Sequence, residues 1–286
     1  LVNERHRSAD ARLATEEAQR RAAAERKRTE EARAATLDQL HKVAEMALKA
    51  TLELRRHGVR AADADFLPIL DVAFRQAVAQ APGRPEPHYH MGRMRRAMLR
   101  PEEALAFQER ALALDPGYAP SLYERAVLLA PHLGERLDIL REAWWRAEGK
   151  RLADAGNLAA GAQDAPSGTR PPSDAELTEG DEKARDLHAH LIADLTRLEQ
   201  GLASGSDPGL SPAMLDCARG LLRFYGSSAL DDRRAARELL EHAVAADSRL
   251  EEAYEGLARL AITEGDIGEA ITICTRGLEA DKGCVP

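Results

Sequence analysis

The sequence predicts an all-α protein: a solenoid of stacked helix pairs preceded by a long charged helix. Alanine, leucine, arginine and glutamate, all strong helix formers, dominate its 286 residues. The β-branched and aromatic residues that build strands are sparse, and aromatic residues make up 4%. A 34-residue period is also visible, because the stretch "RQAVAQAP" ending at Pro82 is answered by "ERALALDP" ending at Pro116. These observations together predict a thin, repetitive core in place of one broad globular core.

Residues 1–36 are expected to form a charged helical stalk. They hold almost nothing apolar beyond alanine, but opposite charges recur four residues apart, as in Glu16 with Arg20. Each such pair adds about 0.2–0.5 kcal/mol to a solvated helix. Leu13 is the only leucine or isoleucine after the first residue, which is too few for a coiled-coil seam, so self-association through this helix is the alternative. Residues 37–152, where the apolar residues take up a helical period, are predicted to form a first block of packed helices.

Residues 85–118 carry small residues and a proline at regular places. Their positions 8, 20, 27 and 32 are held by Gly92, Ala104, Ala111 and Pro116. This spacing resembles the tetratricopeptide repeat (TPR), a 34-residue helix pair. In that fold position 8 faces position 20 where the two helices cross most closely, and a side chain larger than alanine would push the helices apart. The resemblance therefore implies a TPR-type helical solenoid.

Residues 251–284 show the same pattern more completely. The matching positions are held by Tyr254, Leu257, Ala258, Ala261, Gly265, Ala270 and Gly277. Gly265 is expected to end the first helix, because glycine adopts the left-handed conformation without a steric cost. No capping helix follows the second helix, so Ile271, Ile273 or Leu278 is expected to be partly uncovered.

Weaker copies of the repeat surround these two. Residues 67–82 are predicted to form the second helix of an earlier pair, while 119–152 and 211–248 are each predicted to form a degenerate pair. Trp144 and Trp145 are adjacent, so they cannot face the same core, and Trp144 is expected to lie inside because it continues a leucine stripe.

The stretch from 153 to 180 is rich in glycine, proline, serine and acids, without an apolar period. It is predicted to be a mobile linker that separates the first block, 37–152, from a second TPR-like block at 181–286. The chain begins at Leu1 and stops at Pro286, where a further helix would be expected to begin, so both ends are expected to continue in a longer protein.

The residue types that carry catalysis or metal binding do not come together in the sequence. Three cysteines without a CxxC spacing, Cys217, Cys274 and Cys284, favour free thiols over a zinc site or a disulfide framework. The two histidine pairs, His88 with His90 and His188 with His190, are two residues apart and point to different faces of a helix. Phosphate-loop, GxSxG, HExxH and kinase signatures are missing from the sequence. We therefore predict no enzyme activity, no metal and no cofactor.

Charge and hydropathy restrict the partner. The net charge of −8 and the mixing of both signs along the helices disfavour nucleic acid, and no apolar run is long enough to cross a membrane. The resemblance implies a protein or peptide partner in a concave groove lined by the first helix of each pair. Arginines at position 9 would favour an acidic partner, and the candidate residues are Tyr89, Arg93, Arg96, Arg219 and Arg259. The lysine and asparagine with which some TPR proteins clamp a terminal carboxylate are missing from the two clear copies.

The expected location is cytoplasmic. An alternative comes from the alanine-, arginine- and glutamate-rich stalk that leads into irregular TPR units, which resembles the C-terminal regions of some bacterial serine/threonine protein kinases. This resemblance implies a regulatory or sensory arm of a larger enzyme, with a membrane-tethered parent protein as one form of it.

Overall fold

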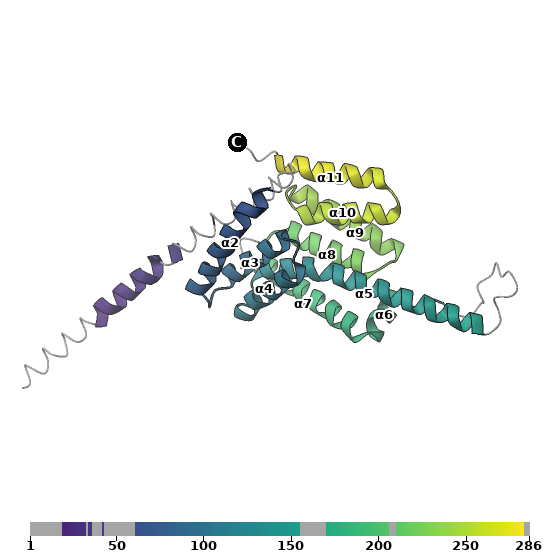
Figure 1. The fold of residues 1–286 in the computed structure, drawn as a ribbon, viewed down its shortest axis with the longest axis horizontal. Helices are drawn as coiled ribbons and strands as arrows, with labels where there is room; N and C mark the ends of the chain where they lie inside the picture. The colour runs from purple at the N-terminus through teal and green to yellow at the C-terminus, as the bar shows by residue number, and fades with distance from the viewer. Residues whose placement is uncertain are drawn as a thin grey trace, which may run out of the picture. The chain divides into compact units, whose positions relative to one another are not determined.

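The computed structural model describes residues 19–32, 34–35, 42, 61–154, 170–205 and 210–282 (Figure 1). Helices make up nearly all of these residues and no strand occurs among them, which confirms the all-α prediction. Their bounds are α2 Ala61–Gln80, α3 Pro85–Ala97, α4 Pro101–Leu114, α5 Ala119–Asp154, α6 Asp174–Gly180, α7 Glu182–Ser204, α8 Pro212–Gly226, α9 Leu230–Ala246, α10 Glu251–Glu264 and α11 Ile267–Lys282. The chain divides into two compact units, Leu1–Met94 and Arg95–Pro286.

In the first unit, the described parts of the predicted stalk, residues 19–32 and 34–35, are helical and exposed. Phe74 and Ala77 of α2 are buried, as the prediction of a packed helix over 67–82 requires. The Phe74 ring is stacked on that of His90 of α3, with a centroid separation of 5.8 Å and an interplanar angle of 10°. This aromatic contact joins α2 to the beginning of α3.

The second unit contains two consecutive helical hairpins, α8–α9 and α10–α11, with clear start and stop signals. The hydroxyl of Ser211 accepts a hydrogen bond from the backbone N–H of Met214, and Pro212 occupies the first turn of α8, where its missing N–H has no consequence. Gly265 ends α10 in the left-handed conformation, with φ 85° and ψ 5°. Its N–H donates to the carbonyls of Ala261 and Ile262, so the turn into α11 follows directly.

Glycines allow the helices of these hairpins to approach closely. A Cβ on Gly220 of α8 would lie 2.8 Å from Cγ of Leu240, and one on Gly256 of α10 would lie 3.0 Å from Cδ1 of the same leucine. Leu240 of α9 therefore fills the space that two glycines leave between α8 and α10. A Cβ on Gly277 of α11 would meet the Tyr254 ring at 3.0 Å.

The predicted repeat-packing residues have the following positions. In 251–284, Leu257, Ala258 and Ala270 are buried, and Gly277 is half-buried. In 85–118, Gly92, Ala104 and Ala111 are buried, whereas Pro116 is exposed just after α4 ends. The small residues thus lie inside, while the proline marks a helix end. The expectation that Ile271, Ile273 or Leu278 is uncovered is confirmed, because Ile271 and Leu278 are exposed, while Ile273 packs in the core.

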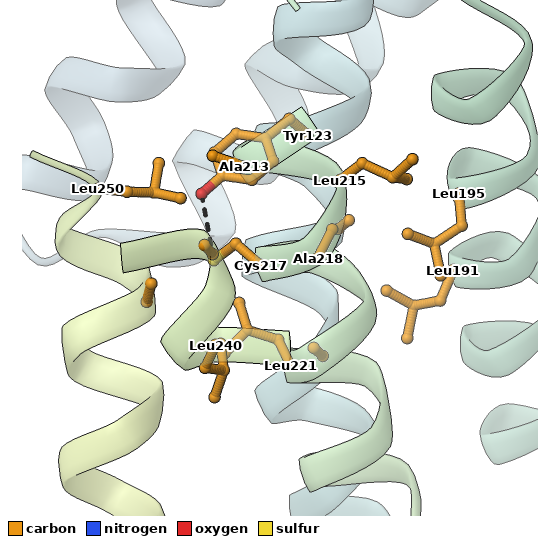
Figure 2. Packing of buried hydrophobic residues seen from close by; sticks show 14 of the residues in the cluster. Tyr123, Leu191, Leu195, Ala213, Leu215, Cys217, Ala218, Leu221, Leu240 and Leu250 are labelled. Carbon is orange, nitrogen blue, oxygen red and sulfur yellow. Dashed lines mark hydrogen bonds between the residues drawn. The ribbon is translucent and has the colours of Figure 1, made fainter. Parts of the chain in front are cut away.

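One apolar core runs through the second unit (Figure 2). It includes Leu122 and Leu133 of α5, Leu191 of α7, Leu221 of α8 and Leu257 of α10. A charged pair also joins α5 to α7, because Arg125 Nε donates to Oδ2 of the fully buried Asp194 at 2.8 Å. Helices on both sides of the segment 153–180 thus share one core, and that segment does not divide it.

The prediction of a helix pair over 119–152 was wrong, because α5 is one helix of 36 residues. Pro131 lies inside it and removes a backbone hydrogen bond, a defect that typically costs about 3 kcal/mol. Leu133 and Leu137 are fully buried just beyond the proline, so packing offsets that cost and the helix continues. Gly134 lies within this helix and does not form a turn. The absence of a side chain there leaves room for Tyr225, because a Cβ on Gly134 would lie 2.8 Å from Cδ1 of that ring. Further along α5, Trp145 is 58% exposed, as expected, whereas Trp144 is only partly buried and does not belong to the core.

The predicted linker also contains a helix. Residues 174–180 form α6, which begins with a capping box in which Ser173 N–H donates to Glu176 Oε2 at 2.7 Å and Glu176 N–H donates back to Ser173 Oγ at 3.3 Å. The prediction of an irregular linker up to residue 180 was therefore wrong for this part, because Ser173 and Glu176 form an S-x-x-E capping signal that begins a helix. Residues 155–169 lie outside the described ranges.

Two carboxylates connect α6 and the start of α7 to the rest of the second unit. Asp181 caps α7 and accepts from Arg136 Nε of α5 at 2.9 Å, and the guanidinium lowers the pKa of Asp181 to about 2. Asp174 accepts from Arg141 Nε at 2.9 Å and from the Ser228 N–H at 2.6 Å. Burial opposes the ionisation of Asp174, but the bonds from Ser228 and Arg141 outweigh it and lower its pKa.

Candidate functional site

Four helices place one polar network on their facing sides. Arg96 of α3 donates through Nη1 to Glu124 Oε2 of α5 at 3.0 Å and through Nη2 to Glu252 Oε1 of α10. Arg96 and Glu252 both belong to the second unit and are 156 residues apart in the sequence, so this ion pair joins the beginning of that unit to its last hairpin. A planar guanidinium suits the task because it can donate to two carboxylates at once.

Tyr123 of α5 and Cys217 of α8 complete the network. The Tyr123 hydroxyl donates to Glu252 Oε2 at 3.2 Å and lies 3.5 Å from Cys217 Sγ, the bond drawn in Figure 2. Burial, followed by the charge of Glu252, raises the pKa of Tyr123 well above its ordinary value. Burial raises the pKa of the Cys217 thiol to about 12, so this sulfur stays protonated at neutral pH.

Arg96 itself remains charged. Burial opposes its charge, but Glu124 and Glu252 outweigh that effect and raise its pKa above the ordinary value. Arg96 and Glu252 stand at positions 12 and 2 of their repeats, which the TPR resemblance assigns to the concave groove. The sequence predicted that Arg96 meets a carboxylate of a partner, whereas in the structure both of its carboxylates come from the chain itself.

Arg219 of α8 and Arg259 of α10 are more accessible. Their side chains are 39% and 52% exposed, and each has a glutamate neighbour. Arg219 Nη2 donates to Glu199 Oε1 of α7 at 2.6 Å, and Arg259 Nη2 donates to Glu255 Oε1 at 2.9 Å. Exposed pairs of this kind contribute about 0–1 kcal/mol, so an incoming carboxylate can compete for either guanidinium.

Tyr225 adds an aromatic ring to this surface. Its hydroxyl interacts with Arg259, and its ring lies against Gly134 of α5. Burial raises the pKa of Tyr225, and Arg259 opposes that shift. We call the set Glu199, Arg219, Tyr225, Glu255 and Arg259 the arginine surface. Sequence reasoning did not find Glu199 and Tyr225, because neither residue stands at a repeat position that marks the groove.

Tyr89 and Arg93 lie in the first unit, on the same helix. The Arg93 guanidinium is 5.9 Å from the centroid of the Tyr89 ring, a cation–π contact at the limit of its range. Both side chains are half-buried. The structure thus brings together these two candidate residues in one unit, and it places Arg96, Arg219 and Arg259 in the other.

Together these features define a class: an all-α protein with consecutive helical hairpins that pack closely at small residues. No protein-family model and no curated protein matches the chain. Three solved structures illustrate what the chain is similar to. PilW, a type IV pilus biogenesis factor, is 12% identical, with 84% of this chain and 78% of PilW covered and a TM-score of 0.41. TTC0263, a TPR protein of Thermus thermophilus, is 19% identical, with 83% of this chain and 91% of TTC0263 covered and a TM-score of 0.42. Yeast Tom70 is 17% identical, with 78% of this chain and 42% of the Tom70 chain covered and a TM-score of 0.30.

Two searches of the described residues concern metals and membranes. No group of three histidine, cysteine, aspartate or glutamate side chains comes together there as a set of metal ligands. None of the helices in those ranges has both the length and the apolar character needed to cross a bilayer. Cys217 is buried, Cys274 is exposed, and Cys284 lies outside the described part of the chain.

Proposed function

We propose that this protein is a non-enzymatic scaffold that binds an acidic peptide segment of another protein on the arginine surface. The observation that supports this most is the recurrence of an exposed arginine at one repeat position of α8 and α10, which pack against each other. A carboxylate that bridges Arg219 and Arg259 would replace two weak internal pairs with charge-assisted hydrogen bonds. Tyr225 offers an aromatic face beside them.

The groups with the largest pKa shifts support a scaffold over an enzyme. Tyr123 and Cys217 are buried and Arg96 is half-buried, and all three interact with one another or with nearby glutamates. A catalytic thiol needs a lowered pKa and access to substrate, whereas the pKa of Cys217 is raised and its side chain is buried. The shifts are therefore consequences of packing four helices together.

Selection from a random peptide library on the immobilised chain tests the proposal. Selected peptides should be enriched in aspartate and glutamate, and their affinity should fall with added salt. The double variant Arg219→Glu/Arg259→Glu should weaken binding by about tenfold or more, which corresponds to about 1.4 kcal/mol. Selected peptides without acidic enrichment, or with equal affinity for the double variant, would contradict the proposal.

A matched control separates this surface from general charge. Arg234 and Arg276 are exposed arginines on α9 and α11, the second helices of their hairpins. The double variant Arg234→Glu/Arg276→Glu has the same net charge as the test variant. It should keep the affinity of the wild-type chain for the selected peptides.

A further inference from the structure

The carboxylate of Glu252 joins three helices. Glu252 lies in the first turn of α10 and accepts from Arg96 of α3 through Oε1 and from the Tyr123 hydroxyl of α5 through Oε2. Arg96 also donates to Glu124 of α5, so the guanidinium bridges two helices. The two partners of Glu252 stand 156 and 129 positions before it in the sequence. These four side chains therefore connect the hairpin α10–α11 to the beginning of the second unit.

A different set of contacts holds α10 within its own pair of hairpins. α10 packs against α8, α9 and α11. A Cβ on Gly256 would lie 2.9 Å from Cδ2 of Leu221 and 3.0 Å from Cδ1 of Leu240, so α10 approaches both α8 and α9 closely there. Leu257, the next residue, is buried as well. Because these apolar contacts begin one turn after Glu252, they can persist when the bonds of Glu252 break.

Cys217 of α8 lies beneath the start of α10. It is fully buried, and its sulfur lies 3.5 Å from the Tyr123 hydroxyl. Figure 2 shows Leu250, the residue that precedes α10, pointing toward the same hydroxyl. Leu250 and Ala253 are buried in the same core cluster as Cys217. The Tyr123 ring and the start of α10 therefore cover this thiol, so the accessibility of Cys217 reports whether α10 is in place.

The two sets of contacts respond differently to a small movement of α10. A hydrogen bond depends steeply on its distance and angle, whereas the stabilisation from apolar burial falls only in proportion to the area exposed. A slight outward movement of the first turn of α10 would therefore break both bonds of Glu252, while most of the apolar area of the helix stays buried. Such local opening requires less free energy than unfolding of the whole unit.

We propose that Arg96, Tyr123, Glu124 and Glu252 form a latch, a polar clasp between the start of α10 and the helices α3 and α5. When the latch is closed, it holds the first turn of α10 in place and hides Cys217. When it opens, the first turn of α10 moves away and the surface of α5 and α8 at Tyr123 and Cys217 becomes accessible, while the rest of the second unit stays folded. The latch is a property of the chain alone and does not depend on the arginine surface proposed above.

Labelling of Cys217 by a thiol reagent in increasing urea tests the latch on the full chain. The background variant Cys284→Ser keeps the exposed Cys274 as an internal measure of reagent reactivity. In this background Cys217 should react only through unfolding, so its rate should rise with urea as steeply as the unfolding equilibrium does. Glu252→Gln should raise the rate without urea by about tenfold or more, because a hydrogen bond to a charged group contributes a factor of this order. That faster labelling should change little at low urea, because local opening exposes little surface.

Two control variants separate the latch from a general loss of stability. Glu255→Gln removes the same charge from the next turn of α10, where the exposed Glu255 pairs with Arg259. It should leave the labelling of Cys217 unchanged. Leu198→Ala removes part of the core on α7, where Leu198 is fully buried. It should raise the labelling rate only as far as unfolding becomes more frequent, and the rate should keep the full urea dependence.

Two results would overturn the latch: a Cys217 rate in Glu252→Gln no faster than in the background, relative to Cys274, or a faster rate that keeps the full urea dependence of unfolding. Circular dichroism should show the helical content of the background. If Glu252→Gln has lost that content, Tyr123→Phe takes its place, because it removes one bond to Glu252 and keeps the ring. The same criteria then apply, with a smaller increase expected. No acidic peptide enters these measurements, so the latch and the arginine surface can fail separately.

Discussion

Gly220 of α8 and Gly149 of α5 have very different surroundings, so the substitution by alanine should have opposite effects at the two positions. A Cβ on Gly220 would lie 2.8 Å from Cγ and 3.0 Å from Cδ2 of Leu240, and 3.2 Å from the carbonyl oxygen of Ala236. The carbonyl is part of α9 and cannot rotate away. Leu240 cannot move freely either, because Gly256 holds α10 against its other side.

The magnitudes decide the sign at Gly220. Alanine is favoured over glycine by about 0.8–1.0 kcal/mol within a helix. Overpacking a closed core typically costs about 1–3 kcal/mol. Gly220→Ala should therefore lower the free energy of unfolding by up to about 2 kcal/mol. A Cβ on Gly149 of α5 meets no atom within 4 Å, so Gly149→Ala should raise that free energy by up to about 1 kcal/mol.

Urea denaturation followed by circular dichroism measures both variants. Their free energies of unfolding should differ by about 1–3 kcal/mol, with Gly220→Ala the less stable, and each kcal/mol corresponds to roughly 2–4 °C in Tm for a unit of this size. Trimming the neighbour with Leu240→Val should make Gly220→Ala less harmful than it is in the wild type. If Gly220→Ala stabilises the protein as much as Gly149→Ala does, the close packing of α8 on α9 is wrong.

Three further predictions concern the charged and thiol groups. Glu252→Gln should lower the free energy of unfolding by about 1.5–3 kcal/mol, because it weakens a partly buried charge-assisted bond. The exposed Glu255→Gln should change that free energy by at most about 0.5 kcal/mol, and chemical denaturation compares the two variants. Asp181 has its pKa lowered to about 2, so its contribution is complete above the ordinary value of 3.8 and disappears as the pH falls toward 2; unfolding midpoints across this range should fall less steeply for Asp181→Asn, and an unchanged slope would contradict the assignment. In the variant Cys284→Ser, a thiol reagent at pH 8 should label Cys274 rapidly and Cys217 only after unfolding. Rapid labelling of both cysteines would refute the burial of Cys217.

Local signals in the sequence were enough to predict part of the fold. Gly265 marks a helix end by its conformational freedom, and the spacing of Ala258, Ala270 and Gly277 marks a close helix pair, so the hairpin α10–α11 follows from nearby residues alone. The helix α6 also had a local signal in Ser173 and Glu176, but the composition of the surrounding segment concealed it.

The length of α5 had no such local signal. Pro131 and Gly134 are the residues that usually separate two helices, and here they lie inside one. What keeps the helix continuous is the burial of Leu133 and Leu137 against helices far along the chain. Tyr225, 91 positions after Gly134, explains the glycine better than any turn does. Tertiary packing overrode the local preference.

The network around Arg96 shows why the candidate site was harder to predict than the fold. A repeat pattern predicts which side of a helix faces the groove, and it predicts that side for both Arg96 and Glu252. The pattern does not specify how the helices stack on one another. That stacking decides whether two groove-side residues 156 positions apart in the sequence come into contact. Because they do touch, an arginine that the pattern offers to an acidic partner already holds two carboxylates. Binding a partner at Arg96 would require breaking partly buried ion pairs to two carboxylates, which costs more than breaking one exposed pair. The same event at Arg259 costs at most about 1 kcal/mol, so an acidic partner should select the exposed arginines.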